Sequence, residues 1–154
     1  MAKPYRLNAG MVVFNSDGLV LAGDRIEYPG HFQLPQGGID EGEEPRQAAI
    51  RELEEEVGLR ADPVGEVEDW LTYEFPEDIP ARLKKYRGQK QKWFFFHWNG
   101  NPDSLDLDLH EREFQSIRWM ALSEVVENII EFKQDVYREL QKHAEKFISQ
   151  YLNS

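Results

Sequence analysis

Three glutamates, Glu52, Glu55 and Glu56, are spaced so that a single helix would carry their carboxylates side by side. Segment 45–57 is expected to be that helix, because it starts with a proline, which suits a first helical turn, and is followed by Gly58, which suits a helix end. At about 100° per residue the three side chains lie within about 100° of one another. Like charges at such spacings repel by a few tenths of a kcal/mol. A ligand that offsets this repulsion is therefore expected.

Carboxylate oxygens are the ligands that hard divalent cations such as Mg²⁺ and Mn²⁺ prefer. Glu43 precedes the helix, so oxygen ligands could converge on a cation from both sides. A cation bound there would remove the repulsion between the carboxylates. The alternative is a solvated helix face, which is the commoner role of glutamate-rich helices.

The residues around this face resemble the Nudix box, which reads glycine, five residues, glutamate, seven residues, then REUxEExGU, where U is a bulky aliphatic residue. All nine specified positions match, with Gly37, Glu43, Arg51, Glu52, Leu53, Glu55, Glu56, Gly58 and Leu59. The resemblance implies an α/β/α sandwich with a mixed central sheet, and a loop–helix–loop motif that binds Mg²⁺ or Mn²⁺. It also implies hydrolysis of a nucleoside diphosphate linked to another group.

Family roles can be assigned to individual positions of this chain. The resemblance implies that Glu52, Glu55 and Glu56 are the principal metal ligands, with Gly37 and Glu113 in the same metal-binding set. It gives Arg51 a supporting role, in which a salt bridge orients carboxylates. The general base is one of the box glutamates or a carboxylate outside the box. Glu113 is the outside candidate and Glu111 is its close competitor.

A narrower resemblance extends over nearly the whole chain. The segments YRLNAGMVV, FQLPQGGID, WLTYEFP, GQKQKWFFF, EFQSIRWM and FKQDVYREL resemble, in that order, bacterial RNA pyrophosphohydrolases and related dinucleoside polyphosphate hydrolases. This implies removal of pyrophosphate from the 5′-triphosphate end of RNA, which leaves a 5′-monophosphate and starts decay. Two alternatives are asymmetric cleavage of diadenosine tetraphosphate and a module that binds nucleotides or RNA without cleaving them. The second need not keep every carboxylate of the box.

Substrate contacts are expected from cationic and aromatic residues outside the box. By resemblance these are Arg6, Arg25, Tyr73, Lys92, Phe132 and Lys133. Without the family, the cations would be ordinary surface residues and the aromatic residues would be core. The run RLKKYRGQKQK, residues 82–92, has six basic residues and no acid, so it is either a solvated loop or a positive entrance for a polyphosphate.

The elements that position these residues can be placed coarsely. LNAGMVVFN and LVLAGDR are predicted to pair as a hairpin through the turn at 16–18. VEDWLTYEF, KWFFFHW and FQSIRWM are further strand candidates, with a loop at 74–91 between the first two. Apolar residues recur at helical spacing from Ser123 to about Leu152. Strands with helices between and after them favour a mixed sheet covered on both faces.

Composition sets the remaining limits. The 154 residues are the size of one domain, so we expect a single domain over residues 1–154. The net charge of −11 argues against nonspecific nucleic-acid binding over the whole surface. The chain has no cysteine, no apolar run of the roughly 20 residues that a membrane span needs, and no apolar signal segment at its start. We therefore expect a cytoplasmic protein that contacts no membrane. The sequence identifies no protein activator.

Overall fold

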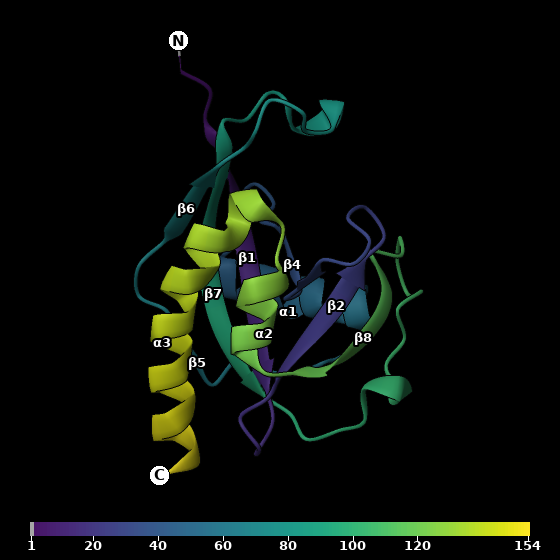
Figure 1. Cartoon of the computed structure of the whole chain (residues 1–154), viewed down its shortest axis with the longest axis vertical. Helices are drawn as coiled ribbons and strands as arrows, with labels where there is room; N and C mark the ends of the chain where they lie inside the picture. The colour runs from purple at the N-terminus through teal and green to yellow at the C-terminus, as the bar shows by residue number, and fades with distance from the viewer. Residues whose placement is uncertain (1) are drawn as a thin grey trace.

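A computed structural model describes residues 2–154 (Figure 1). It contains eight strands, three α-helices and three short 3₁₀ helices (η). In chain order they are β1 (Tyr5–Phe14), β2 (Val20–Arg25), β3 (Phe32–Gln33), β4 (Gln36–Gly38), α1 (Pro45–Val57), β5 (Gly65–Glu66), β6 (Leu71–Glu74), η1 (Ala81–Leu83), β7 (Gly88–His97), η2 (Pro102–Ser104), β8 (Phe114–Met120), α2 (Leu122–Asn128), η3 (Glu131–Lys133) and α3 (Gln134–Leu152).

The strands form one mixed sheet. β1 runs parallel to β7 along its whole length, from Tyr5 opposite Gly88 to Phe14 opposite His97. Every other strand pair is antiparallel, including the predicted β1–β2 hairpin. The order along the main path is β3-β2-β1-β7-β5, with β4 beside β1, β6 beside β7 and β8 beside β2. The predicted mixed sheet is confirmed.

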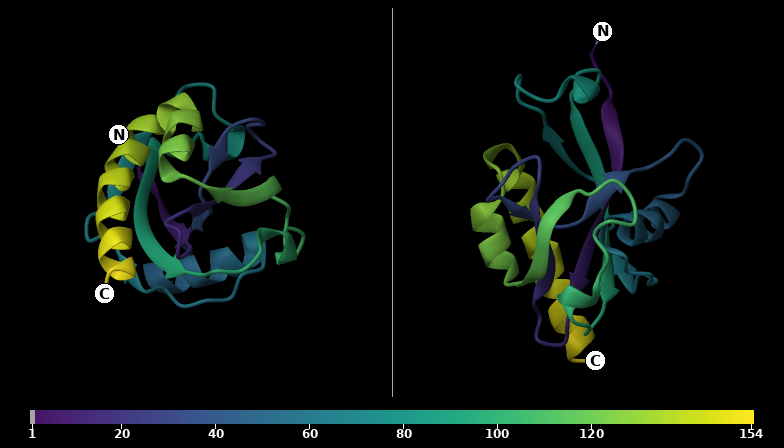
Figure 2. Two further views of the ribbon diagram at one scale, coloured as in Figure 1. Left: turned by 60° about the horizontal axis from the view of Figure 1, so that its bottom comes forward. Right: turned by 90° about the vertical axis from the view of Figure 1, so that its right-hand side faces the viewer.

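Helices cover both faces of this sheet, as Figure 2 shows. Side chains alternate along β1 because successive residues of a strand point to opposite faces. Met11 and Val13 belong to a buried cluster with Leu53 of α1, whereas Val12 and Phe14 belong to a second cluster with residues of α2 and α3. The α/β/α sandwich predicted from the sequence is therefore confirmed.

Helix α1 has the predicted bounds. Its first residue is the proline at 45, and the backbone N–H of Glu44 donates to the side chain of Gln47 at 3.4 Å across the first turn. Gly58 ends the helix in the left-handed region, at φ 75°, and its N–H donates to the carbonyl of Glu54. Residues other than glycine rarely adopt this conformation, which explains the glycine at this position.

The C-terminal region differs from the predicted continuous helical segment. Helix α2 ends at Asn128, and η3 leads into α3, so that Phe132 and Lys133 lie at the entry to the last helix. At the other end of α3, Phe147 stacks on Phe95 with ring centroids 4.2 Å apart, and Tyr151 packs edge-on against Phe14. Helix α3 is thus fixed to the sheet near its C-terminal end by aromatic contacts.

Strand β7 begins at Gly88, four residues before the predicted start at Lys92. Gln89 and Gln91 are polar but buried, because they pair with β1 and turn their side chains to the inner face of the sheet. The predicted loop between β6 and β7 is therefore shorter than expected and contains η1. Over residues 2–154, no helix combines the length and the apolar character that crossing a membrane requires.

Candidate active site

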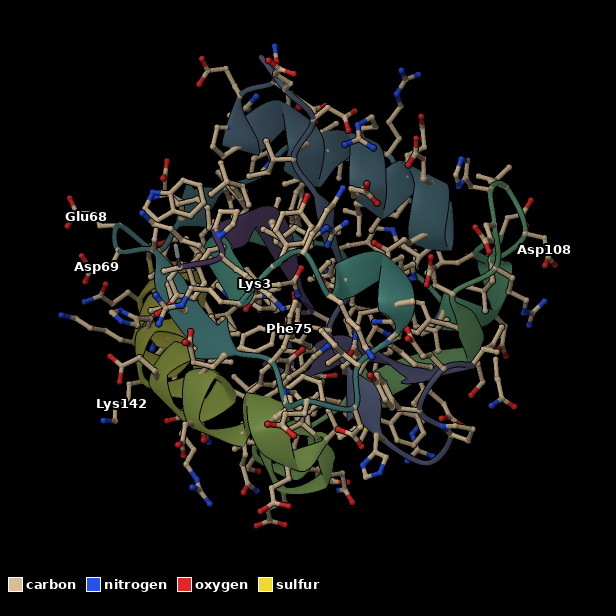
Figure 3. All side chains as sticks on the ribbon, turned by 90° about the horizontal axis from the view of Figure 1, so that it is seen from above. Lys3, Glu68, Asp69, Phe75, Asp108 and Lys142 are labelled. Carbon is tan, nitrogen blue, oxygen red and sulfur yellow. The ribbon has the colours of Figure 1, made fainter. Side chains whose placement is uncertain are left out.

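A cavity of about 490 Å³ lies at the end of the molecule where α1, β2, β6 and the entry to α3 meet. Figure 3 looks onto this end, with Phe75, one of the lining residues, near the centre of the view. Most of the residues singled out from the sequence line the cavity, namely Arg6, Arg25, Gly37, Glu52, Glu55, Glu56, Tyr73, Glu113, Phe132 and Lys133. Arg51 and Lys92 are not among the lining residues.

Arg51 lies behind the cavity and binds the carboxylates of its neighbours. Its guanidinium donates to Glu43 twice at 2.9 Å, to Glu52 at 2.8 Å and to Glu55 at 3.2 Å. A further bond reaches the carbonyl of Gly38 at 3.0 Å. These bonds lower the pKa of Glu43 and raise that of Arg51. The geometry is that of a residue that orients carboxylates.

The sequence did not reveal how Glu43 is used. We expected its oxygens to approach a cation together with the helix glutamates. In the structure both oxygens of Glu43 accept hydrogen bonds from Arg51, and one also accepts from the backbone N–H of Asp40 at 3.0 Å. Glu43 therefore holds Arg51 in place. Glutamate spacing predicts that two acids share a region but does not tell which one binds the nearby arginine.

Glu56 is the most deeply buried acid of the site, with 7% of its surface exposed. Its Oε2 atom is buried and has no hydrogen-bond partner among residues 2–154. Burial raises the pKa of Glu56 well above its ordinary value, and the charges of Glu52 and Glu113 add to the rise, while Arg25 opposes it. Burial also raises the pKa of Glu52, against the effect of Arg51. The site concentrates negative charge that the protein itself compensates only in part.

This arrangement suits an oxygen-binding cation. A buried carboxylate oxygen without a partner is unfavourable unless a proton or a cation reaches it. Gly37 lies so close to the Glu52 carboxylate that a methyl group on its Cα would overlap it, so a larger residue at this position would displace that carboxylate. In residues 2–154 no three acidic or histidine side chains are already grouped as a metal site. Arg51 binds Glu52 and Glu55, so a cation would compete with its guanidinium for their oxygens.

Glu113 and Glu111 both line the cavity, but their surroundings differ. Glu113 accepts a hydrogen bond from Arg25 at 3.0 Å and is close enough to raise the pKa of Glu56. Glu111 is exposed and forms no hydrogen bond or salt bridge within the described chain. The position of Glu113 favours it over Glu111 as a carboxylate that acts with the helix glutamates.

Aromatic side chains form a row along another part of the cavity. Phe132 lies between Tyr28 and Tyr73, with ring centroids 6.2 and 5.8 Å away, and Tyr73 contacts Phe75 at 5.8 Å. Phe132 is partly buried and also packs against the core cluster, so it serves the core and the cavity together. The row offers flat apolar surface beside the acidic site.

Lys133 follows this row and is 5% exposed. Its Nζ donates to Oε1 of Gln33 at 3.0 Å and lies 5.9 Å from the ring centres of Tyr73 and Phe132. Burial, assisted by the charge of Arg25, lowers the pKa of Lys133 to about 7. Lys133 is therefore charged only in part near neutral pH, and an anion bound in the cavity would favour its charged form.

Lys92 is not brought to the cavity. Its Nζ lies 3.0 Å from a carboxylate oxygen of Glu66 and donates to the backbone carbonyl of Glu68 at 2.6 Å. The physical reason is the alternation along β7, where Gln89 and Gln91 face inward while Lys92 faces the other way. The face of the sheet to which Lys92 points could be predicted from the sequence only if the pairing register of β7 were known.

Gln89 was not singled out from the sequence, yet it holds two predicted site residues. Its Oε1 accepts a hydrogen bond from Arg6 at 2.7 Å, and its amide group donates to the hydroxyl of Tyr73. Burial raises the pKa of the Tyr73 hydroxyl, so this group remains protonated. No signal in the sequence pointed to this role, because Gln89 lies in the predicted loop at 74–91 and the strand extends over it only in the structure.

Comparison with known proteins agrees with this site. Residues 4–140 match the family model described as the NUDIX domain. An RNA pyrophosphohydrolase from Cereibacter sphaeroides is 45% identical over 143 residues, which cover 89% of this chain and 88% of that protein. Nudix hydrolase 25 from Arabidopsis thaliana is 38% identical over 155 residues, covering 94% of this chain and 89% of the plant protein.

Solved structures share the fold at lower sequence identity. A MutT protein from Methanosarcina mazei superposes with a TM-score of 0.70 at 17% identity, covering 93% of this chain and 97% of that one. An Ap4A hydrolase from C. elegans gives a TM-score of 0.63 at 19% identity, covering 90% and 98% of the two chains. Nudix hydrolases generally use divalent metal ions, which agrees with the acidic cavity. With its complete box on α1, its sandwich fold and these relatives, the chain belongs to the Nudix family of hydrolases.

Proposed function

We propose that this protein removes pyrophosphate from the 5′-triphosphate end of RNA, leaving a 5′-monophosphate and so promoting RNA decay. The observation that carries the proposal is the joining of two features in one cavity: the carboxylates around Glu56, and the aromatic row with Lys133 beside it. The first suits a phosphoanhydride and the second suits an unpaired base with its phosphates. Relatives named RNA pyrophosphohydrolase at 41–45% identity support this choice. Such a substrate agrees with the predicted cytoplasmic setting.

Mg²⁺ or Mn²⁺ is the proposed cofactor. Glu52, Glu55 and Glu56 would hold it, together with the backbone at Gly37, and Glu113 would act on the water or hold an ion that arrives with the substrate. All five residues line the cavity. When bound, the ion would neutralise phosphate charge and make a water more acidic. Arg51 would keep the carboxylates of Glu52 and Glu55 oriented, as its hydrogen bonds indicate.

The remaining residues have separate tasks in this proposal. Arg6, Arg25 and Lys133 attract the triphosphate, because all three cations line the cavity. Phe132 and Tyr73 face the base next to the 5′ end. One carboxylate among the box glutamates and Glu113 accepts the proton of the attacking water. The leaving group is pyrophosphate, and the RNA keeps its first phosphate.

Purified protein with Mg²⁺ tests the proposal directly. Triphosphorylated RNA and diadenosine tetraphosphate are supplied in separate reactions, and products and rates are compared. Pyrophosphate and 5′-monophosphorylated RNA as the faster products support the proposal. Faster cleavage of diadenosine tetraphosphate would identify the alternative activity, and binding without turnover of either would indicate a recognition module.

Phe132→Ala is expected to impair cleavage of a triphosphorylated oligonucleotide more than cleavage of a lone nucleoside triphosphate. Stacking on an aromatic ring is worth roughly 1–3 kcal/mol per base, so kcat/KM for the oligonucleotide should fall about tenfold or more. The lone nucleotide has no downstream base to lose. Lys133→Ala is the comparison, and it should impair both substrates. Equal losses for Phe132→Ala at fixed ionic strength, in a folded protein, would mean that Phe132 serves only the core.

Lys133 should also give substrate binding a dependence on pH. With its pKa lowered to about 7, Lys133 is charged below that pH and becomes neutral above it. KM for the triphosphorylated substrate is therefore expected to rise, by up to about tenfold, as the pH increases through neutrality. KM is measured across this range for the wild type and for Lys133→Gln. If the variant shows the same rise, the dependence has another source.

A further inference from the structure

Residues 76–86, which connect β6 to β7, form an arm at the mouth of the cavity. In Figure 1 the arm is the teal segment with a short helix, at the same end of the molecule as the N-terminus. Its residues Ile79, Arg82 and Leu83 line the cavity. Ile79 is 9% exposed, yet it belongs to neither of the two core clusters. The arm therefore forms part of the cavity wall and is not part of either core cluster.

Few bonds hold the arm to the rest of the chain. Its backbone hydrogen bonds are internal, from Leu83 to Pro80, from Lys84 to Ala81 and from Tyr86 to Leu83. Across residues 2–154, the hydrogen bonds that leave the arm are those from Arg82 to the two carboxylate oxygens of Glu27, at 3.2 and 3.4 Å. A single ion pair is thus the polar anchor of the whole segment.

Glu27 has a second partner inside the cavity. Its Oε2 also accepts from Arg25 at 3.2 Å, and the same nitrogen of Arg25 donates to Glu113 at 3.0 Å. Opposite charges therefore alternate from Glu113 through Arg25 and Glu27 to Arg82. Glu27 connects the arm to the residues next to the carboxylates, although the two parts are 55 residues apart in the chain.

We propose that Glu27 and Arg82 form a latch that holds the arm over the cavity, where Ile79 and Leu83 complete the apolar wall that receives the base of the substrate. The inference rests on the proposed function, because it assumes a substrate with a base at this wall. Glu27 and Arg82 are positioning residues in this view. They determine how well the cavity discriminates a nucleotide-containing substrate from a bare polyphosphate.

Arg82→Gln tests the latch with two measurements. Hydrogen–deuterium exchange in the arm, followed without substrate, should become faster because the anchor is gone. KM for triphosphorylated RNA should rise about two- to fivefold, the range for a partly exposed ion pair, while kcat stays within about twofold. Arg82→Lys keeps the charge and should restore most of the KM. Glu27→Gln removes the same anchor from the other side and should also make exchange in the arm faster.

Two controls separate the latch from simpler effects. Arg87→Gln breaks a salt bridge of the same chemistry, to Glu74 at 2.7 Å, just beyond the arm and outside the cavity. This variant should leave KM unchanged. Inhibition by inorganic tripolyphosphate, which has no base, should be equal for the wild type and Arg82→Gln.

Each contrary result has a defined meaning. Equal KM increases for Arg87→Gln and Arg82→Gln would show that the overall positive charge of this region affects KM, and that the Glu27–Arg82 pair has no specific effect. Weaker inhibition of Arg82→Gln by tripolyphosphate would make Arg82 a phosphate contact, which also overturns the proposal. Unchanged exchange and KM in Arg82→Gln would refute the latch alone. Absence of RNA turnover in the wild type would instead refute the proposed function.

Discussion

Glu56→Gln is expected to lower turnover on the order of a thousandfold while leaving the fold intact. The substitution keeps the volume of the side chain and removes the charge of the most buried acid of the site. Its unpartnered Oε2 is the oxygen best suited to a cation, and an amide is a much weaker ligand. Activity is measured at saturating Mg²⁺, so that weaker metal affinity alone does not account for the loss.

The same variant should change thermal stability in a characteristic way. Because the pKa of Glu56 is raised in the folded protein, its ionised form opposes folding at pH values above the ordinary range of a glutamate. At neutral pH and without divalent ions, Glu56→Gln should therefore melt at a higher temperature than the wild type. Added Mg²⁺ should stabilise the wild type by binding the folded state, and it should stabilise the variant much less.

Glu54→Gln is the matched control for both measurements. Glu54 lies on the same helix but is partly exposed, pairs with Arg60 at 3.4 Å and does not line the cavity. Its substitution should leave activity and the Mg²⁺-dependent shift in melting temperature unchanged. An active Glu56→Gln enzyme would remove Glu56 from the metal-binding set.

Glu113→Gln is expected to lower kcat about a hundredfold while the Mg²⁺-dependent rise in melting temperature persists. Glu113 lies beside Arg25 and near Glu56, so it can act on the water or on a cation that arrives with the substrate. Retained metal stabilisation would distinguish this role from that of Glu56. The measurement combines single-turnover rates with melting curves at several Mg²⁺ concentrations.

Glu111→Gln provides the comparison, because Glu111 lines the same cavity but is exposed and unpaired within the described residues. It should retain nearly full activity. If Glu111→Gln is the damaging change and Glu113→Gln is silent, the family alignment of this segment is wrong. If both are silent, the base lies among the glutamates of α1.

The sequence predicted the parts of the site that depend on short-range pattern. The bounds of α1 follow from a proline, a glycine and helical spacing, all of them local signals, so the glutamate face was predictable. The hairpin of β1 and β2 was predictable for the same reason, since a turn sequence separates two aliphatic runs. The sandwich followed from family resemblance together with the order of the elements.

Long-range partners were not predictable in this way. The partner of Glu43 depends on the direction of the Arg51 side chain. The face of the sheet on which Lys92 lies depends on the register between β7 and β1. No proline or glycine marks the break between α2 and α3. The helical spacing of apolar residues therefore seemed to continue through it. The latch between Glu27 and Arg82 joins two loops whose proximity only the folded sheet provides.

If Lys133 binds phosphate as proposed, the far end of helix α3 also influences phosphate binding. Helix α3 starts directly after Lys133 and continues for 19 residues, a rod of about 28 Å. Phe147 and Tyr151 dock that rod on Phe95 and Phe14 near its other end. Because backbone hydrogen bonds hold an α-helix together along its length, a shift of α3 at one end also moves its other end. A tag, a truncation or a binding protein that disturbs these aromatic contacts would therefore displace the ammonium group in the cavity without touching it.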